Sequence, residues 1–80
     1  MRSENGKTIE ESLVSVMPYV AYPGELKELI RAEEAICASI EEFIENFRRK
    51  NSAISDATKR TDGQIFLNEL RRNLEKSGSD

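Results

Sequence analysis

The most regular part of the chain is residues 26–47, which read LKELIRAEEAICASIEEFIENF. Apolar residues return there every three or four positions, the spacing that keeps side chains on one face of a helix. They occupy three neighbouring heptad positions: Leu26, Ile40 and Phe47 in the first, Leu29, Ile36 and Phe43 in the second, Ile30, Cys37 and Ile44 in the third. We therefore predict one continuous amphipathic helix, whose apolar face is too wide to be left in water.

A shorter helix is expected before this stretch. Thr8 and Glu11 have the spacing of a capping box, so a helix is predicted to begin at Thr8. Pro18 removes a backbone donor and clashes with the preceding turn, so this helix should end or kink near Met17. Pro23 suits a first helical turn and marks the expected start of the long helix.

The chain after residue 52 allows two interpretations. Thr61 and Gln64 form a second possible capping box, and Gly63 is unfavourable inside a helix, which together favour a last helix from about Gly63 to Ser77. The alternative is one continuous helix from about Ser52 to Lys76. In both cases the apolar residues from Ile65 onward face inward.

The fold class that follows is all-α, a small three-helix unit with one long central amphipathic helix. Residues 8–77 are expected to form the helical domain, residues 1–7 a disordered lead and residues 78–80 a polar tail. The central helix is about twice as long as the first, so part of its apolar stripe would stay uncovered, and such patches usually mark an interface. We therefore predict a homodimeric helical bundle that self-associates through five stripe residues: Ile36, Ile40, Phe43, Ile44 and Phe47.

Glu33 interrupts the stripe, because it occupies the heptad position of Leu26, Ile40 and Phe47. A buried unpaired charge is costly. Two interpretations remain open: Glu33 lies at the edge of the stripe and reaches water, or it pairs with a cation across an interface and sets the register.

Composition narrows the possible classes. With 80 residues the chain can form at most one domain, and its single cysteine, Cys37, excludes an intrachain disulfide. Cys37 lies within the apolar stripe, so we predict a buried thiol in a reducing compartment. No apolar run approaches the roughly 18 residues needed to span a bilayer, so a cytoplasmic protein is expected.

Nothing in the chain predicts catalysis, a metal or a cofactor. It has no histidine, no glycine-rich phosphate loop, and no nucleophile beside a base. Residues 62–70 resemble the second half of an EF-hand loop, but counting back places Thr58 and Arg60 at the first and third ligand positions, where carboxylates are needed. We predict instead that Asp62 is a helix N-cap, and that the protein is not an enzyme.

The leading functional prediction is a protein–protein interaction module that acts as a regulator, inhibitor or adaptor through a helix face. Tyr19 and Tyr22 flank a stiff proline-containing connector and could anchor a partner, because tyrosine loses little rotamer entropy on binding. An acidic docking surface is expected from three glutamates, Glu34, Glu41 and Glu45. The alternatives are that the tyrosines only pack on the end of the bundle and that the glutamates only form a solvent-exposed helix face.

The alternative function is a dimeric nucleic-acid-binding transcriptional regulator. The net charge is −3, but residues 1–45 carry four Lys/Arg and ten Asp/Glu, while residues 46–80 carry eight and five. A basic second half could contact phosphates. Its candidate residues are Arg48, Arg49, Lys50, Lys59, Arg60, Arg71 and Arg72.

Overall fold

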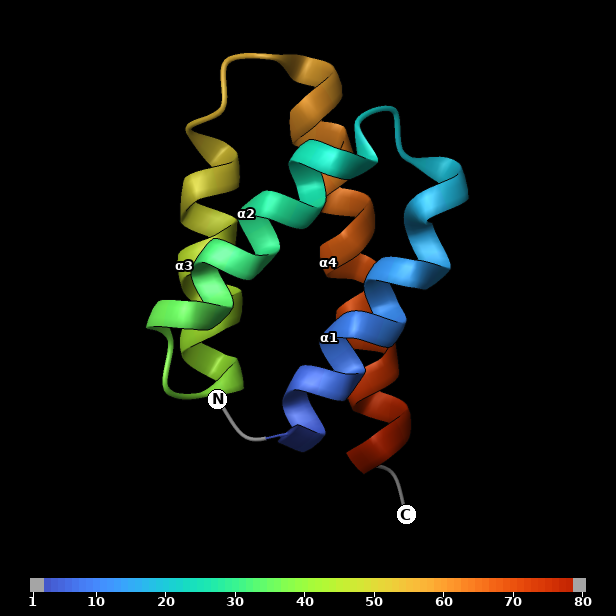
Figure 1. Ribbon diagram of the computed structural model, residues 1–80, viewed down its shortest axis with the longest axis vertical. Coiled ribbons are helices and arrows are strands. Elements are labelled where there is room, and N and C mark those ends of the chain that lie inside the picture. The colour runs from blue at the N-terminus through green and yellow to red at the C-terminus, as the bar shows by residue number, and fades with distance from the viewer. Residues whose placement is uncertain (1–2, 79–80) are drawn as a thin grey trace.

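The computed structural model of the chain describes residues 3–78, and within that range it is all-α, with four α-helices and no strand (Figure 1). A short 3₁₀ helix, η1, follows the first α-helix. The elements are α1 (Ser3–Val16), η1 (Met17–Tyr19), α2 (Pro23–Ile36), α3 (Ile40–Ser52) and α4 (Ala57–Gly78). The all-α class is confirmed, whereas the three-helix arrangement is wrong because the long central helix does not exist.

The predicted central helix is divided at residues 37–39 into a helical hairpin. Cys37 is extended (φ −96°, ψ 140°), and Ser39 is the N-cap of α3. The Glu42 backbone N–H donates to Ser39 Oγ at 3.2 Å, and the Ala38 N–H donates to Glu42 Oε1 at 2.6 Å. This exchange is a variant of the capping box, and it gives α3 its own beginning.

The other helix ends agree only in part with the sequence prediction. Helix α1 ends at Val16, before Pro18, and α2 begins at Pro23, both as expected. Helix α1 begins at Ser3, so residues 3–7 are helical rather than an irregular lead and Thr8 is not an N-cap; residues 1, 2, 79 and 80 lie outside the described range.

Helix α4 begins at Ala57, six residues before the predicted start at Gly63. Asp56 caps it, because its Oδ1 accepts from the Thr58 N–H at 2.9 Å and from the Lys59 N–H at 3.1 Å. The predicted N-cap role of Asp62 is therefore wrong. Asp62 lies inside the helix, where its carboxylate is free to contact other elements.

The core is centred on three phenylalanines from α3 and α4. The ring centroids of Phe43 and Phe47 are 5.7 Å apart, and that of Phe66 lies 6.3 Å from Phe43 and 5.3 Å from Phe47. All three side chains are fully buried. The prediction that Phe43 and Phe47 lie on an open self-association surface is therefore wrong, because the hairpin folds them against α4 of the same chain.

Helices α1 and α3 both pack along α4, and α2 packs across α3 and the first part of α4. Helices α1 and α4 run antiparallel (Figure 1). Ile9, Leu13 and Val16 bury the inner face of α1. Cys37 is also buried, as predicted, and its sulfur accepts from Asn46 Nδ2 at 3.4 Å.

Glu33 lies inside this core, with a fully buried side chain. Lys50 Nζ on α3 donates to Glu33 Oε2 at 2.5 Å, while the lysine side chain is 52% exposed. Glu33 is therefore not at the edge of the stripe. It pairs with a cation, but across the α2–α3 contact of one chain.

Gly63 allows the close approach of α3 to α4. A β-carbon built there would lie 2.0 Å from Asn51 Oδ1, well inside any real contact distance. Asn51 is buried, and its Nδ2 donates to the Arg60 carbonyl at 3.0 Å. Gly63 is therefore needed for packing inside a continuous helix, and it does not end one.

Candidate functional site

The most exposed large apolar side chain among the described residues is Tyr19, at 76%. It stands in η1, the 3₁₀ turn that forms where Pro18 ends the α-helical pattern. Because η1 comes directly after α1, Tyr19 is held beside the surface where α1 packs on α4. Pro18 restricts the backbone of this turn, so it limits where the Tyr19 side chain can begin.

Tyr19 lines an open groove of about 460 Å³ between α1 and α4. Val16 and Ile65 supply its other apolar atoms, and four polar residues complete the lining: Ser15, Asn68, Glu69 and Arg72. Ser15 Oγ donates to Glu69 Oε2 at 3.1 Å, and Arg72 Nη2 lies 3.8 Å from Glu69 Oε1. The groove therefore has an apolar part with a polar border that is already ordered by contacts within the chain.

Tyr22 lies in a different place, at a second cavity of about 300 Å³. That cavity is lined by the connector before α2, the first half of α2, the end of α3, the α3–α4 loop and the first turns of α4, which meet at one end of the molecule (Figure 1). The two tyrosines therefore do not form one patch. The sequence prediction grouped them because they are close along the chain.

Asp62 holds the connector in position. Its two carboxylate oxygens accept from consecutive backbone N–H groups, Ala21 at 2.9 Å and Tyr22 at 2.8 Å. The carboxylate is almost fully buried. Hydrogen bonds from two amides to a carboxylate are among the stronger ones in proteins, so Asp62 fixes where α2 begins and where Tyr22 lies.

Lys59 covers the Tyr22 ring. Its Nζ is 5.4 Å from the ring centroid and 2.9 Å from Glu25 Oε1. The hydrogen bond to Glu25, with the negative charge of that carboxylate, raises the pKa of Lys59. The ammonium form is thus favoured at the mouth of this cavity.

The three glutamates of the predicted acidic face do not share a helix. Glu34 is on α2, and its carboxylate lies near Gly6 of α1; a β-carbon at Gly6 would be 3.7 Å from Glu34 Oε2. Partial burial and then the charge of Glu10 raise the pKa of Glu34, against the opposing effect of Arg31. Glu41 and Glu45 are exposed on α3, and Glu45 pairs with Arg48 at 3.0 Å.

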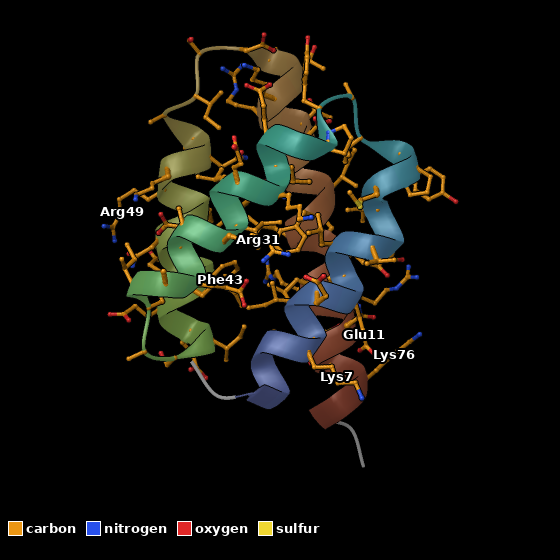
Figure 2. All side chains as sticks on the ribbon, viewed as in Figure 1. Lys7, Glu11, Arg31, Phe43, Arg49 and Lys76 are labelled. Atoms are coloured by element: carbon orange, nitrogen blue, oxygen red, sulfur yellow. The ribbon has the colours of Figure 1, made fainter. Side chains whose placement is uncertain are left out.

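The basic residues of the nucleic-acid alternative are mostly engaged inside the chain. Arg48, Lys50, Lys59 and Arg72 form ion pairs with glutamates. Arg60 donates to the carbonyls of Ile54 and Ser55, at 2.7 and 3.2 Å, and so closes the α3–α4 loop. Within residues 6–76, Arg49 and Arg71 are the two members of the set without such a contact, and Arg49 points outward from α3 (Figure 2).

Sequence reasoning missed two polar residues that line the second cavity. Asn51 and Asp62 stand on the inner faces of α3 and α4, where a helical pattern alone suggests solvent or a cap. The available signal was periodicity: Asn51 follows Phe47 by four positions, and Asp62 precedes Phe66 by four. Residues in phase with core phenylalanines are expected inside.

These features define a small all-α protein with an open, mainly polar groove between α1 and α4 and a mainly apolar cavity at one end of the molecule. In the described residues no helix is both long enough and apolar enough to cross a membrane. The chain belongs to the MJ1579 family, whose family model matches residues 6–75 and so covers the four helices almost entirely. No curated protein and no solved structure matched the chain.

Proposed function

We propose that this protein is a small non-enzymatic binding module that regulates, inhibits or adapts another protein through the groove between α1 and α4. The observation that carries the proposal is Tyr19, 76% exposed beside a groove that Ile65 and the largely buried Val16 also line. Tyrosines in such positions are frequent binding hot spots.

The residues that line the groove indicate which side chains of a partner would fit it. An aliphatic or aromatic side chain would fill the apolar part and contact the Tyr19 ring. Ser15, Glu69 and Arg72 supply donors and acceptors at the border, which matches the polar rim of protein interfaces. The buried thiol of Cys37 supports the further proposal that the protein works in the cytoplasm.

Nucleic-acid binding is not proposed as a second function. Five of the seven basic residues that supported it have partners within the chain. Arg49 and Arg71 remain, too few charges for the multiple phosphate contacts on which such binding depends.

The test begins with a photoreactive benzoylphenylalanine placed at position 19, and at position 22 as a control, to crosslink the partner in extracts of the native host. The identified partner is then titrated calorimetrically with the wild-type protein, Tyr19→Ala and Arg49→Ala. We expect Tyr19→Ala to weaken binding by at least about tenfold, or roughly 1.4 kcal/mol. Arg49→Ala removes another exposed side chain, from α3, and should leave the affinity unchanged.

Both variants should fold, because both side chains project from the surface. Equal affinities of Tyr19→Ala and wild type would show that the groove is not the binding surface. Weaker binding by Arg49→Ala instead would move the interface to α3 and overturn the proposal.

A further inference from the structure

The second cavity, of about 300 Å³, has a volume at the lower end of the range typical of small-molecule sites, which is about 300–1,000 Å³. Its walls are mainly apolar: Leu26 and Leu29 come from α2, Ile54 from the α3–α4 loop, and Tyr22 presents its ring. A branched alkyl group of four or five carbons is the kind of body that such walls favour.

The polar groups around the cavity are mostly acceptors. Glu25 and Asp62 are carboxylates, whereas the buried Asn51 Oδ1 atom lies against Gly63 and is not exposed to the cavity. The face of the Tyr22 ring carries negative electrostatic potential. Lys59 is the one cation in the lining, so two carboxylates outnumber it. This balance favours a ligand that carries positive charge and N–H donors.

Lys59 itself shows how such a ligand would be held. Its ammonium group lies over the Tyr22 ring, 5.4 Å from the centroid, and contacts Glu25 at 2.9 Å. These are the two contacts that an alkylammonium ion makes in an aromatic and anionic site. The ammonium group of Lys59, a residue of α4, therefore already occupies the place at the cavity mouth that a ligand cation would take.

We infer that this cavity binds an alkylammonium ion, with its alkyl group among Leu26, Leu29 and Ile54 and its ammonium group between Glu25 and the Tyr22 ring. Lys59 competes for that position. The site is separate from the α1–α4 groove and shares no residue with it. The inference therefore stands independently of the proposed function.

The test uses three probes with one alkyl body and different charge: isoamylammonium, isoamyl alcohol and isovalerate. Each is titrated into the full-length, isotopically labelled protein, and shifts of the Leu26 and Leu29 methyl groups and the Asn51 side-chain amide are followed by NMR. We expect saturable shifts with isoamylammonium at a dissociation constant of roughly millimolar order, as befits a ligand of six heavy atoms. The alcohol should bind at least about threefold more weakly, and isovalerate weakest.

Three variants test the roles assigned to individual residues in ammonium binding. Lys59→Met removes the competing ammonium while keeping an unbranched apolar side chain, and should strengthen isoamylammonium binding roughly two- to fivefold, the range of an exposed charge interaction. Glu25→Gln should weaken it by a similar factor. Tyr19→Ala lies outside the cavity and should leave the affinity unchanged.

A capped lysine, Nα-acetyl-lysine methylamide, distinguishes a free amine from a partner's lysine side chain. If the capped lysine binds more tightly than isoamylammonium, the site is assigned to a lysine of a protein partner. If it binds more weakly, the site is assigned to a small free amine. Isovalerate binding as tightly as the ammonium, equal binding of the alcohol, or the absence of saturable shifts at Leu26 and Leu29 would each overturn the inference. The probe series on the wild-type chain decides this even where a variant fails to fold.

Discussion

At the scale of single residues, this fold depends on polar groups placed inside a small core. Asp62 binds two backbone amides of the connector, and Asn51 fills the space left by Gly63. Buried polar groups are tolerated when they are hydrogen-bonded and destabilise when a partner is removed. Each such residue therefore needs particular hydrogen-bond partners beside it, whereas a buried leucine needs only apolar neighbours.

The contact between Asn51 and Gly63 predicts that Gly63→Ala has opposite effects on stability in two backgrounds. Gly63→Ala should destabilise the wild-type protein by about 1–3 kcal/mol, because the new methyl group overlaps Asn51 Oδ1. In an Asn51→Ala background the same substitution should stabilise by about 1 kcal/mol, through the better helix propensity of alanine. Urea unfolding of the four proteins measures both. Equal effects of Gly63→Ala in the two backgrounds would contradict the contact.

The Glu33–Lys50 pair gives a second prediction. Lys50→Met leaves the buried carboxylate without its cation, and should lower the free energy of unfolding by about 1–3 kcal/mol. Adding Glu33→Leu should recover most of this loss, because an apolar residue of similar size suits the site. Arg48→Met, which breaks an exposed pair with Glu45, is the matched control and should cost less than about 1 kcal/mol. Similar losses for the two single variants would place Glu33 in contact with water.

At the scale of elements, the hairpin between α2 and α3 is the feature that determines the fold. Three residues, 37–39, turn the chain, and Ser39 begins the new helix. The turn lets Phe43 and Phe47 fold back toward α4 and gives Cys37 its buried position. One continuous helix would leave those side chains in solvent.

The cap of α3 is testable by substitution. Ser39→Ala should destabilise by about 1 kcal/mol, because it removes the acceptor for the Glu42 N–H. Ser52→Ala serves as the control: the Ser52 hydroxyl donates to the Arg48 carbonyl on an exposed turn, and its loss should change stability by less than about 0.5 kcal/mol. Thermal unfolding compares them. A Ser39→Ala protein as stable as Ser52→Ala would mean that the cap contributes nothing.

The contact of α1 with α2 should make stability depend on pH through Glu34. Partial burial and Glu10 raise its pKa in the folded chain above the unfolded value, so the folded state binds the extra proton and stability falls as pH rises through that interval. We expect Glu34→Gln to raise the melting temperature at pH 7 and to have little effect below pH about 4, where both states are protonated. A stabilisation that is equal at both pH values would assign the effect to packing and not to charge.

At the scale of the whole molecule, the hairpin removes the main reason for predicting a homodimer. The phenylalanines of the predicted self-association set are inside the chain, whereas Ile36 is 66% exposed and Ile40 and Ile44 are half-buried. Of the predicted self-association set, only these three isoleucines are left to contact a second copy of the chain. Self-association through them stays a prediction.

Light scattering coupled to size exclusion tests that prediction at two protein concentrations. If the isoleucine surface is used, the wild-type mass should be twice the chain mass of 9.1 kDa, and Ile36→Asp should reduce it to a single chain. Ile36→Asp should also fold, because this side chain is largely exposed. A wild-type mass of 9.1 kDa at both concentrations would exclude self-association under those conditions.

The sequence by itself determined the all-α class, the helix boundary before Pro18, the start of α2 at Pro23 and the burial of Cys37. These features follow from local chemistry. The spacing of apolar residues predicts helices, the prolines mark helix ends and starts, and the place of Cys37 in the apolar stripe predicts a buried thiol. For Tyr19 the sequence left two alternatives open, a partner anchor or a cap on the bundle, and it did not show the groove beside this residue, which needs Ile65 from a distant helix.

Only the tertiary structure decided where the stripe is interrupted and which polar residues are buried. A heptad pattern fits one long helix and a hairpin of two shorter ones equally well, because each half keeps the same inward phase. The choice depends on whether another surface, here Phe66 of α4, can cover Phe43 and Phe47 once the chain turns. Likewise Gly63 weakens a helix locally, but it is retained inside α4 because Asn51 packs directly over it. Contacts between residues far apart along the chain determined these features, and no local pattern contains them.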